Sequence, residues 1–381
     1  MASIHPYKAK TKHPKSRSHT RYRVQWRDEQ GTQRKKSGFA YKNEAELFIS
    51  NLTVAMSNNT YVSPGAGTRR MGDYGEVWLN RQQHLKPSTM NLYTSTWMQH
   101  IKPRWETVPL KDIRHGDVAD WIHGLRSQAF RGDQVGQPAG DSVKRRALSL
   151  MSQILKQAVH ERLIASNPAE GVKLARKPPA RKVYLTFEQM KALANNSAHP
   201  DIVMTLGTTG IRWGELAGLR VMDVDVNRNR LHIRQNAVRV RSKMHVGTPK
   251  SHEQRTVAAP GFVTDMISKQ CEGKLSTDLV WSQQDGTPLK PPGHRRWLDV
   301  AVNRTVAQGV ISSEQRVTAH GLRHVAAGLL VNANANVKTV QRQLGHQSAA
   351  ITLDVYADLF DGALDEVSTA FDAMNDNFGS S

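Results

Sequence analysis

The segment AHGLRHVAAGLLV, residues 319–331, combines basic side chains with an apolar run that is typical of a helix packed in a core. His320 and Arg323 are three residues apart, so on a helix both side chains lie on one face. Taken alone, the pair has an ordinary explanation, because a lone histidine is more often a satisfied structural residue than a catalyst. The segment predicts a helix that presents an imidazole and a guanidinium together.

Three other segments of the C-terminal half carry polar residues that stand out in the same way. Singly, an arginine followed by a glutamate is usually a surface ion pair, and a tyrosine near a chain end is usually packing. The segments are TTGIRWGELAGLR (208–220) with Arg212 at the start of a helix and Glu215 one turn later, TPKSHEQRTV (248–257) with Lys250 in a strand turn, and LGHQSAAITLDVYADLF (344–360) with His346 and Tyr356.

Taken together and in this order, the segments resemble the tyrosine recombinase family, the phage-type integrases. The resemblance is to the family's Arg…Lys…His-x-x-Arg…His…Tyr set and to its T-G-x-R-x-x-E-L, H-x-L-R-H and L-G-H-x-x-x-x-x-T-x-x-x-Y boxes. It covers roughly residues 183–360 and is specific, because six polar residues must fall in register. Val325 departs slightly from the common pattern, since a small hydroxyl residue often stands there, and this puts no catalytic role in doubt.

The resemblance implies an enzyme, a site-specific DNA strand transferase. Tyr356 would attack a DNA phosphodiester, form a 3′-phosphotyrosyl link and expel a 5′-hydroxyl. A free 5′-hydroxyl from a second strand would reverse the step, so the bond energy is kept and no ATP is needed. A phenol with an ordinary pKa near 10 needs a base at neutral pH, and His320 is the implied base.

The same resemblance assigns roles around the phosphorus. Negative charge grows on the non-bridging oxygens of a pentacoordinate transition state, and a guanidinium suits them because it is always charged and offers a planar fork. Lys250, in a mobile hairpin, would protonate the leaving oxygen, and Glu215 would orient its neighbour rather than react. The implied oxygen-binding residues are Arg212, Arg323 and His346.

The sequence predicts neither a metal nor a cofactor for this chemistry. A zinc site needs three or four ligands, and no acidic partner completes one beside His320 and Arg323. The two-metal route of other nucleases needs clustered carboxylates, which these boxes lack. There is also no G-x-x-x-x-G-K-S/T phosphate loop. We therefore expect strand cleavage without ATP and without a divalent ion.

The charge of the chain points to DNA as its partner. There are 53 Lys and Arg against 33 Asp and Glu over 381 residues, a formal net charge of +20. Residues 1–182 hold 32 of these cations and 14 of these acids, so the excess lies in the first half. The cations continue through segments with folded periodicity, which favours a polyanion partner over a merely solubilising tail.

Composition also limits the cellular compartments in which we expect the protein to work. No stretch approaches the roughly 20 apolar residues of a membrane-spanning helix, and the N-terminus lacks the apolar core of a secretory signal. The single cysteine, Cys271, excludes a disulfide framework and fits a reducing compartment. We expect a protein of the cytoplasm of a bacterial host cell, associated with the nucleoid and without a membrane partner.

The upstream segments suit the domain order of many integrases. Residues 1–60 are expected to form a small N-terminal arm-type DNA-binding domain of ββ(β)α type. Within it, residues 1–20 are expected to be a flexible basic arm, two strands alternate over 21–27 and 33–39, and Asn43 caps a helix. The expected DNA contacts of this domain are Arg21, Arg23, Arg34, Lys35 and Lys36.

Residues 70–172 are expected to form a helical, SAM-like core-binding domain, followed by a Pro-rich basic linker over 173–183. Asp117 and Ser142 are expected to cap two of its helices. The longest helix has an apolar stripe that we interpret as plain core. The expected DNA contacts off that stripe are Lys144 and Arg145.

Residues 183–381 are expected to form an α+β catalytic domain, with Thr186 capping a helix and three short antiparallel strands over 224–260. The whole chain is therefore expected to be multidomain and mainly α with small β elements. The acidic tail over 361–381 either packs against a neighbouring subunit or forms an ordinary terminal helix. Candidate contacts in that tail are Leu364, Asp365 and Phe371.

The expected function is that of a phage-type integrase, a recombinase that integrates and excises a phage or mobile element. Its expected partners are double-stranded DNA attachment sites, together with host DNA-bending and directionality factors. A homotetramer on DNA is implied, because recombining two duplexes needs four strand cleavages.

Three alternatives remain open at this point. A dimer-resolving tyrosine recombinase usually lacks an arm-binding domain, so residues 1–60 argue against it. A type IB topoisomerase shares the chemistry, but the separate basic N-terminal module favours recombination. A non-catalytic DNA-binding regulator would have no reason to keep Tyr356.

Overall fold

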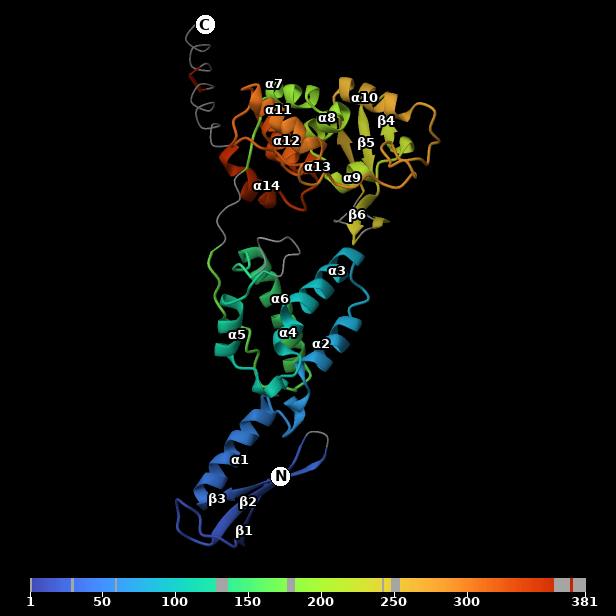
Figure 1. Cartoon of the computed structure of the whole chain (residues 1–381). Coiled ribbons are helices and arrows are strands. Elements are labelled where there is room, and N and C mark those ends of the chain that lie inside the picture. The colour runs from blue at the N-terminus through green and yellow to red at the C-terminus, as the bar shows by residue number, and fades with distance from the viewer. Residues whose placement is uncertain are drawn as a thin grey trace. The chain divides into compact units, whose positions relative to one another are not determined.

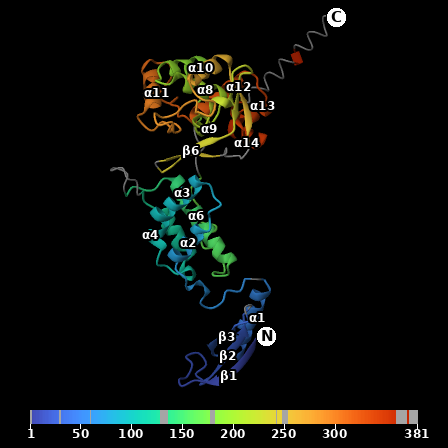
Figure 2. The same ribbon diagram turned by 90° about the vertical axis from the view of Figure 1, so that its right-hand side faces the viewer.

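The computed structural model describes residues 2–28, 31–58, 60–127, 136–176, 182–241, 243–247, 254–359 and 371–372. Its contacts divide the chain into two compact units, Met1–Pro178 and Pro179–Ser381. Figure 1 shows the elements of both units, and Figure 2 shows them from a second side. Apart from residues 371–372, the acidic tail and its predicted packing lie outside the described residues.

The first unit begins with a three-stranded antiparallel sheet and one helix. These elements are β1 (Ser3–Lys8), β2 (Thr20–Arg27) and β3 (Gln33–Phe39), in the sheet order β1-β2-β3, and α1 (Lys42–Ser57). The two predicted strands are confirmed, whereas the prediction of a flexible arm over 1–20 is wrong for Ser3–Lys8. Ile4 pairs with Val24 and packs against the same core, so an apolar partner orders this basic segment.

The core of this small module runs one residue past the predicted boundary at 60. Trp26 Nε1 donates a hydrogen bond to the Tyr61 hydroxyl at 3.0 Å. The predicted cap of α1 is wrong, because Tyr41 occupies the N-cap and Asn43 lies inside the first turn. The buried core residues are Val24, Trp26, Ala45, Leu52 and Tyr61.

The rest of the first unit is helical. Its helices are α2 (Met71–Asn80), α3 (Pro87–Thr96), a π-helical turn (Trp97–Ile101), α4 (Lys102–Trp105), α5 (His115–His123) and α6 (Asp141–His160). The apolar stripe of α6 is core, as predicted, with Met151, Ile154 and Leu155 fully buried. Gly75 makes room for this core, because a Cβ there would lie 2.2 Å from the Trp97 ring.

The predicted caps of α5 and α6 are wrong by three and two residues, respectively. Arg114 and Gly140 occupy the N-caps, so Asp117 and Ser142 lie in the first turns. An acidic side chain still stands in each first turn, Asp117 in α5 and Asp141 in α6, where it interacts favourably with the helix dipole. The predicted residues therefore lie close to the two helix starts, but neither one is the N-cap.

The second unit combines helices with two small sheets. Its helices are α7 (Phe187–Asn195), α8 (Pro200–Thr209), α9 (Trp213–Ala217), α10 (Gly261–Cys271), α11 (Trp297–Ala307), α12 (Gly321–Asn332), α13 (Val337–Leu344) and α14 (Ala349–Tyr356). The capping of α7 by Thr186 is confirmed, since its hydroxyl accepts from Gln189 N at 3.2 Å. Helices α8 and α12 pack against each other, and apolar residues of both enter one core.

The strands of this unit are more numerous than the sequence predicts. They are β4 (Val224–Asp225), β5 (Arg230–Ile233), β6 (Asn236–Val240), β7 (Lys243–Gly247) and β8 (Arg255–Ala258). One antiparallel sheet has the order β4-β5-β8, and β6 pairs with β7 as a hairpin. The prediction of three strands over 224–260 is wrong. Asn229 and Arg241 adopt positive φ and form turns that divide the segment into more strands, and its polar composition did not reveal these turns.

In the described part of the chain, no helix is both long enough and apolar enough to cross a membrane.

Candidate active site

The start of α12 holds a deeply buried cation. Arg323 is 3% exposed, and its Nη1 donates to the Gly210 carbonyl at 2.7 Å. Gly210 ends α8 with φ +68°, a left-handed conformation that suits glycine and leaves its carbonyl for the guanidinium. The other terminal nitrogen, Nη2, is buried and finds no hydrogen-bond partner among the described residues. Burial first, and the Arg212 charge second, lower the pKa of Arg323 to about 10, so it stays charged at neutral pH.

Arg212 is held at the N-cap of α9 by the carboxylate one turn later. Arg212 N donates to Glu215 Oε2 at 2.8 Å and Nη1 donates to Oε1 at 2.9 Å. Its Nη2 reaches the Gly345 carbonyl at 3.4 Å. The sequence predicts that Glu215 orients Arg212 rather than reacts, and this arrangement has the geometry for that role.

Arg255, at the start of β8, is a third guanidinium that the sequence analysis missed. Its Nη1 and Nη2 donate to the two oxygens of Glu215 at 2.9 and 2.7 Å. Burial raises the pKa of Glu215, but the hydrogen bond and charge of Arg255, together with Arg212, outweigh it and lower that pKa to about 2. The only sequence signal for Arg255 was its place in the quoted segment 248–257, where a single arginine before a strand has no specific meaning.

His346 follows α13 directly after Gly345, whose φ of +68° ends that helix. A Cβ on Gly345 would lie 2.6 Å from Arg255 Nε, so glycine lets the two segments meet. His346 Nδ1 lies 2.9 Å from the Thr352 hydroxyl. Burial, then the Arg323 and Arg212 charges, lower the pKa of His346 to about 4, so its imidazole is neutral at pH 7.

Tyr356 is the last residue of α14 and is 1% exposed. Its ring stacks on His346 with centroids 6.1 Å apart at 12°. Its hydroxyl lies 2.9 Å from Nδ1 of His324, a residue for which the sequence analysis gave no role. The Lys182 ammonium stands 5.8 Å from the ring centroid. The phenol is therefore enclosed by two imidazoles and a cation.

His320, the predicted base, occupies the N-cap of α12 and is exposed. Its ring lies 5.4 Å from that of His324, which in turn is half-buried against Tyr356. The signal for His324 was present in the sequence, because the quoted box reads His-x-x-Arg-His and the last position falls one turn after His320.

The structure thus brings five of the six predicted catalytic residues into one connected cluster. The sixth, Lys250, lies outside the described residues, between the end of β7 and the start of β8. A polar cavity of about 280 Å³ adjoins the cluster and includes Arg255, Arg342 and His346 in its lining. The roles of the six residues remain predictions.

The cations predicted to contact DNA in the N-terminal module mostly make contacts within it. Arg34 pairs with Asp28 at 2.8 Å, and the Lys36 ammonium lies 4.5 Å from the Phe48 ring centroid. Arg21 donates to the Thr11 carbonyl at 3.0 Å, and the Arg23 guanidinium lies 5.1 Å from the Tyr7 ring centroid. Lys35 is exposed. Their contact with DNA remains a prediction.

The two predicted DNA contacts of α6 also reach backbone carbonyls of their own module. Lys144 Nζ donates to the His123 carbonyl at 2.8 Å, and Arg145 donates to the Ala175 carbonyl. These bonds orient both side chains but do not exclude phosphate contacts, because each cation has further donors.

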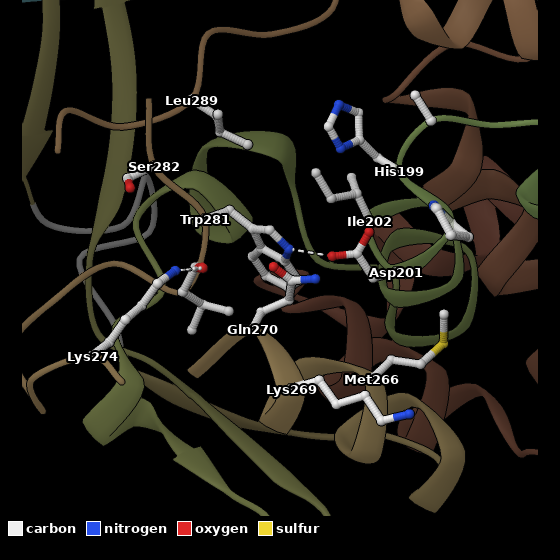
Figure 3. A pocket seen from close by; sticks show the side chains of 13 residues that line it. His199, Asp201, Ile202, Met266, Lys269, Gln270, Lys274, Trp281, Ser282 and Leu289 are labelled. Carbon is white, nitrogen blue, oxygen red and sulfur yellow. Dashed lines mark hydrogen bonds between the residues drawn. The ribbon is translucent and has the colours of Figure 1, made fainter. Parts of the chain in front are cut away.

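A larger cavity of about 450 Å³ lies elsewhere in the second unit (Figure 3). Its lining includes Trp281 and Asp201, joined by a hydrogen bond from Trp281 Nε1 to Asp201 Oδ2 at 2.6 Å, and also His199. None of the predicted catalytic residues lines it. Across the described ranges, no three His, Cys, Asp or Glu side chains are placed to hold a metal ion together, and cleavage without a metal remains a prediction.

Two family models match the chain. The one described as the phage integrase family matches residues 182–362, which include every member of the cluster. The one described as the N-terminal SAM-like domain of phage integrases matches residues 71–126, within the predicted core-binding domain.

Proteins of similar sequence include integrases and a tyrosine recombinase. An integrase of Mycobacterium phage FRAT1 is 22% identical over 325 residues, which cover 81% of this chain and 92% of that protein. The tyrosine recombinase XerC of Listeria monocytogenes is 28% identical over 249 residues, which cover 62% of this chain and 75% of that protein.

Solved structures share the fold. The Tn1549 transposon integrase in complex with circular intermediate DNA matches with a TM-score of 0.60 at 18% identity, over 78% of this chain and 100% of that one. A lambda integrase tetramer bound to a Holliday junction matches with a TM-score of 0.51 at 17% identity, over 86% and 93% of the two chains.

Proposed function

The chain belongs to the phage integrase family of tyrosine recombinases, and on that premise we propose that it is a site-specific recombinase that inserts a phage or mobile element into DNA and excises it. The observation that carries the proposal is the convergence of guanidiniums and imidazoles around one buried phenol. Arg323 keeps a buried donor without a partner among the described residues, and Tyr356 stacks on His346 in the same cluster. A phosphodiester oxygen is the kind of acceptor that such a donor needs.

In the proposed reaction, the Tyr356 hydroxyl oxygen forms a bond to phosphorus while the bond from phosphorus to the 5′-oxygen breaks. The phenol loses its proton, and the 5′-oxygen leaves with the electron pair and gains a proton, for which Lys250 is the proposed donor. The product is a 3′-phosphotyrosyl link and a free 5′-hydroxyl. A 5′-hydroxyl of another strand reverses the step, so the reaction consumes no ATP.

The surrounding groups stabilise the charge that develops on the phosphoryl oxygens. Arg212 and Arg323 are proposed to donate to these oxygens, and losing one such donor typically costs about 10²–10³ in rate. His346 is neutral at pH 7, as its lowered pKa of about 4 implies, so it acts as a hydrogen-bond donor and not as a cation. When the Thr352 hydroxyl donates to Nδ1, the proton of His346 stands on Nε2 and is free for the phosphate.

The proposed partners follow from the same reaction. Recombination between two duplexes needs four cleavages, and we propose a homotetramer on the two attachment sites. Similar structures support this, because one is an integrase in complex with DNA and another is an integrase tetramer bound to a Holliday junction. Host DNA-bending and directionality factors are proposed as further partners.

The test is to trap the covalent intermediate on DNA. A nicked duplex that carries the attachment core, read from the junctions of the inserted element, lets the cleaved end diffuse away and prevents religation. We expect a covalent complex in the presence of chelator and without ATP, with the 3′-phosphoryl group on Tyr356 by peptide mass spectrometry.

The matched variants are Tyr356→Phe and Tyr41→Phe, the latter at an exposed tyrosine outside the second unit. The first should lose the covalent complex while it keeps DNA binding, and the second should keep both. A Tyr356→Phe protein that still captured DNA covalently would overturn the nucleophile assignment. A dependence on divalent ions would overturn the metal-free chemistry alone.

A further inference from the structure

The hydroxyl of the nucleophile candidate, Tyr356, is within hydrogen-bond distance of an imidazole. His324 Nδ1 lies 2.9 Å from the Tyr356 hydroxyl oxygen, and the two ring centroids are 5.6 Å apart. His324 follows the buried Arg323 on α12, so the core that fixes the helix also fixes the imidazole. Tyr356 is held from the other side by the stacked His346 ring. The Tyr356 hydroxyl is therefore held within hydrogen-bond distance of one defined ring nitrogen, Nδ1 of His324.

We propose that His324 is a further catalytic residue, which accepts the proton of the Tyr356 hydroxyl as its oxygen attacks phosphorus. This inference rests on the proposed recombinase function. In the step, the Nδ1 lone pair takes the phenolic proton, the oxygen forms the bond to phosphorus, and the 5′-oxygen leaves with its electron pair to be protonated by the acid. In the reverse step, Nδ1–H returns its proton to the phenolic oxygen as the phosphotyrosyl bond breaks.

The surroundings keep His324 in the form that such a base needs. A base must start neutral, with its proton on Nε2 and a free lone pair on Nδ1. Burial lowers the pKa of His324, and the nearby charges of His320, Arg323 and Lys182 lower it further. The titratable groups that face it from the elements around it are His320 and Arg323 of α12, Lys182 ahead of α7, His346 after α13 and Tyr356 of α14.

The same charges favour the reaction after the proton has moved. The Lys182 ammonium, 5.8 Å from the ring centroid of Tyr356, stabilises the phenolate that forms there. They also disfavour a lasting imidazolium, so the proton is readily returned for religation. His320, the base implied by resemblance, is exposed at the N-cap and lacks this enclosed position.

The test measures the single-turnover rate of covalent complex formation by His324→Asn against pH. The asparagine oxygen stands near the position of Nδ1 and keeps an acceptor, but it cannot take a proton near neutral pH. A 5′-bridging phosphorothioate substrate is used throughout, because a thiolate leaves without a general acid and removes the titration of Lys250 from the profile.

We expect His324→Asn to be slower by about 10²–10⁴ at pH 7, the usual contribution of a general base. The difference in rate between this variant and the unaltered protein should shrink as the pH approaches the ordinary phenol pKa near 10, where the nucleophile ionises without help. His294→Asn, at an exposed histidine that pairs with Asp299, should match the unaltered protein at every pH. DNA affinity and thermal unfolding of His324→Asn should be unchanged.

Two outcomes would overturn the proposal. A loss in His324→Asn that stays constant from pH 7 to 10 would show that the residue only positions Tyr356. If His320→Asn were instead the slow variant, and its rate approached that of the unaltered protein as the pH rose while His324→Asn was unaffected, the base would be His320. Failure of the recombinase function itself looks different, because the unaltered protein would then form no phosphotyrosyl complex at any pH.

Discussion

Arg323 and Glu215 illustrate how single residues of this site depend on partners far away in the sequence. Arg323 is satisfied on one side by the Gly210 carbonyl, and Glu215 joins Arg212 to Arg255. A buried carboxylate between two guanidiniums is stable only while all three are present, because removing one partner leaves an uncompensated buried charge. Glu215 therefore fixes the geometry of two guanidiniums at once.

We predict that Glu215→Gln lowers the free energy of unfolding by about 3–5 kcal/mol at pH 7, since two guanidiniums lose their buried partner. The folded-state pKa of Glu215 is depressed to about 2 from an ordinary 4.5, so its stabilisation is complete above pH 4.5 and is lost as the pH falls toward 2. The difference between the two proteins, measured by urea unfolding, should therefore shrink from pH 7 to pH 3.

The control for that prediction is Glu272→Gln, at an exposed carboxylate that follows α10. It should change the free energy of unfolding little at any pH. A Glu215→Gln penalty that was the same at pH 7 and pH 3 would contradict the depressed pKa.

At the scale of elements, short turns bring the site together. Gly345 ends α13 in the left-handed conformation and places His346 beside the strand β8 that carries Arg255. Gln343 of the same helix donates to the carbonyls of Thr209 and Ala258 at 3.2 and 2.7 Å, and so ties α13 to α8 and to β8. Arg212, His346 and Tyr356 of the candidate site thus stand at helix ends or directly beyond them.

We predict that Gly345→Ala slows covalent complex formation by about 10²-fold, because a Cβ 2.6 Å from Arg255 Nε displaces the guanidinium that holds Glu215. The matched control is Gly309→Ala, at a φ of +72° with nothing within 4 Å of the added Cβ. Both variants carry the left-handed backbone cost of about 1–2 kcal/mol. Equal loss of activity in the two would show that backbone strain, and not the contact with Arg255, limits the reaction.

At the scale of the whole molecule, the basic excess and the candidate catalytic groups lie in different parts of the chain. Residues 1–182 hold 32 of the 53 Lys and Arg, whereas the candidate site belongs to the second unit. Binding of DNA and cleavage of DNA should therefore be separable by truncation.

We predict that deletion of residues 1–61, which removes the N-terminal module together with Tyr61 of its core, spares cleavage of an isolated attachment core. Integration of a plasmid that carries the full attachment site should be lost. Each phosphate contact removed should also lower the slope of log affinity against log salt by about 0.9, which filter binding over a salt series measures. If the truncated protein lost core cleavage but kept its full DNA affinity, binding and cleavage would not depend on different parts of the chain as predicted.

Local features of the fold and most members of the candidate site could be predicted from the sequence. Motif spacing and resemblance selected Arg212, Arg323, His346 and Tyr356, and periodicity located the two strands of the first module and the buried stripe of α6. It did not find β1, because a basic segment becomes a strand only when an apolar neighbour such as Val24 is there to pair with Ile4.

The sequence alone thus determined which polar residues occur at the spacing of the family motif, and on which kind of element each one stands. The tertiary structure decided the partners: Arg255 on Glu215 across forty residues, and His324 on the Tyr356 hydroxyl. The physical reason is that hydrogen bonds act over about 3 Å in space, whereas a motif records only distance along the chain.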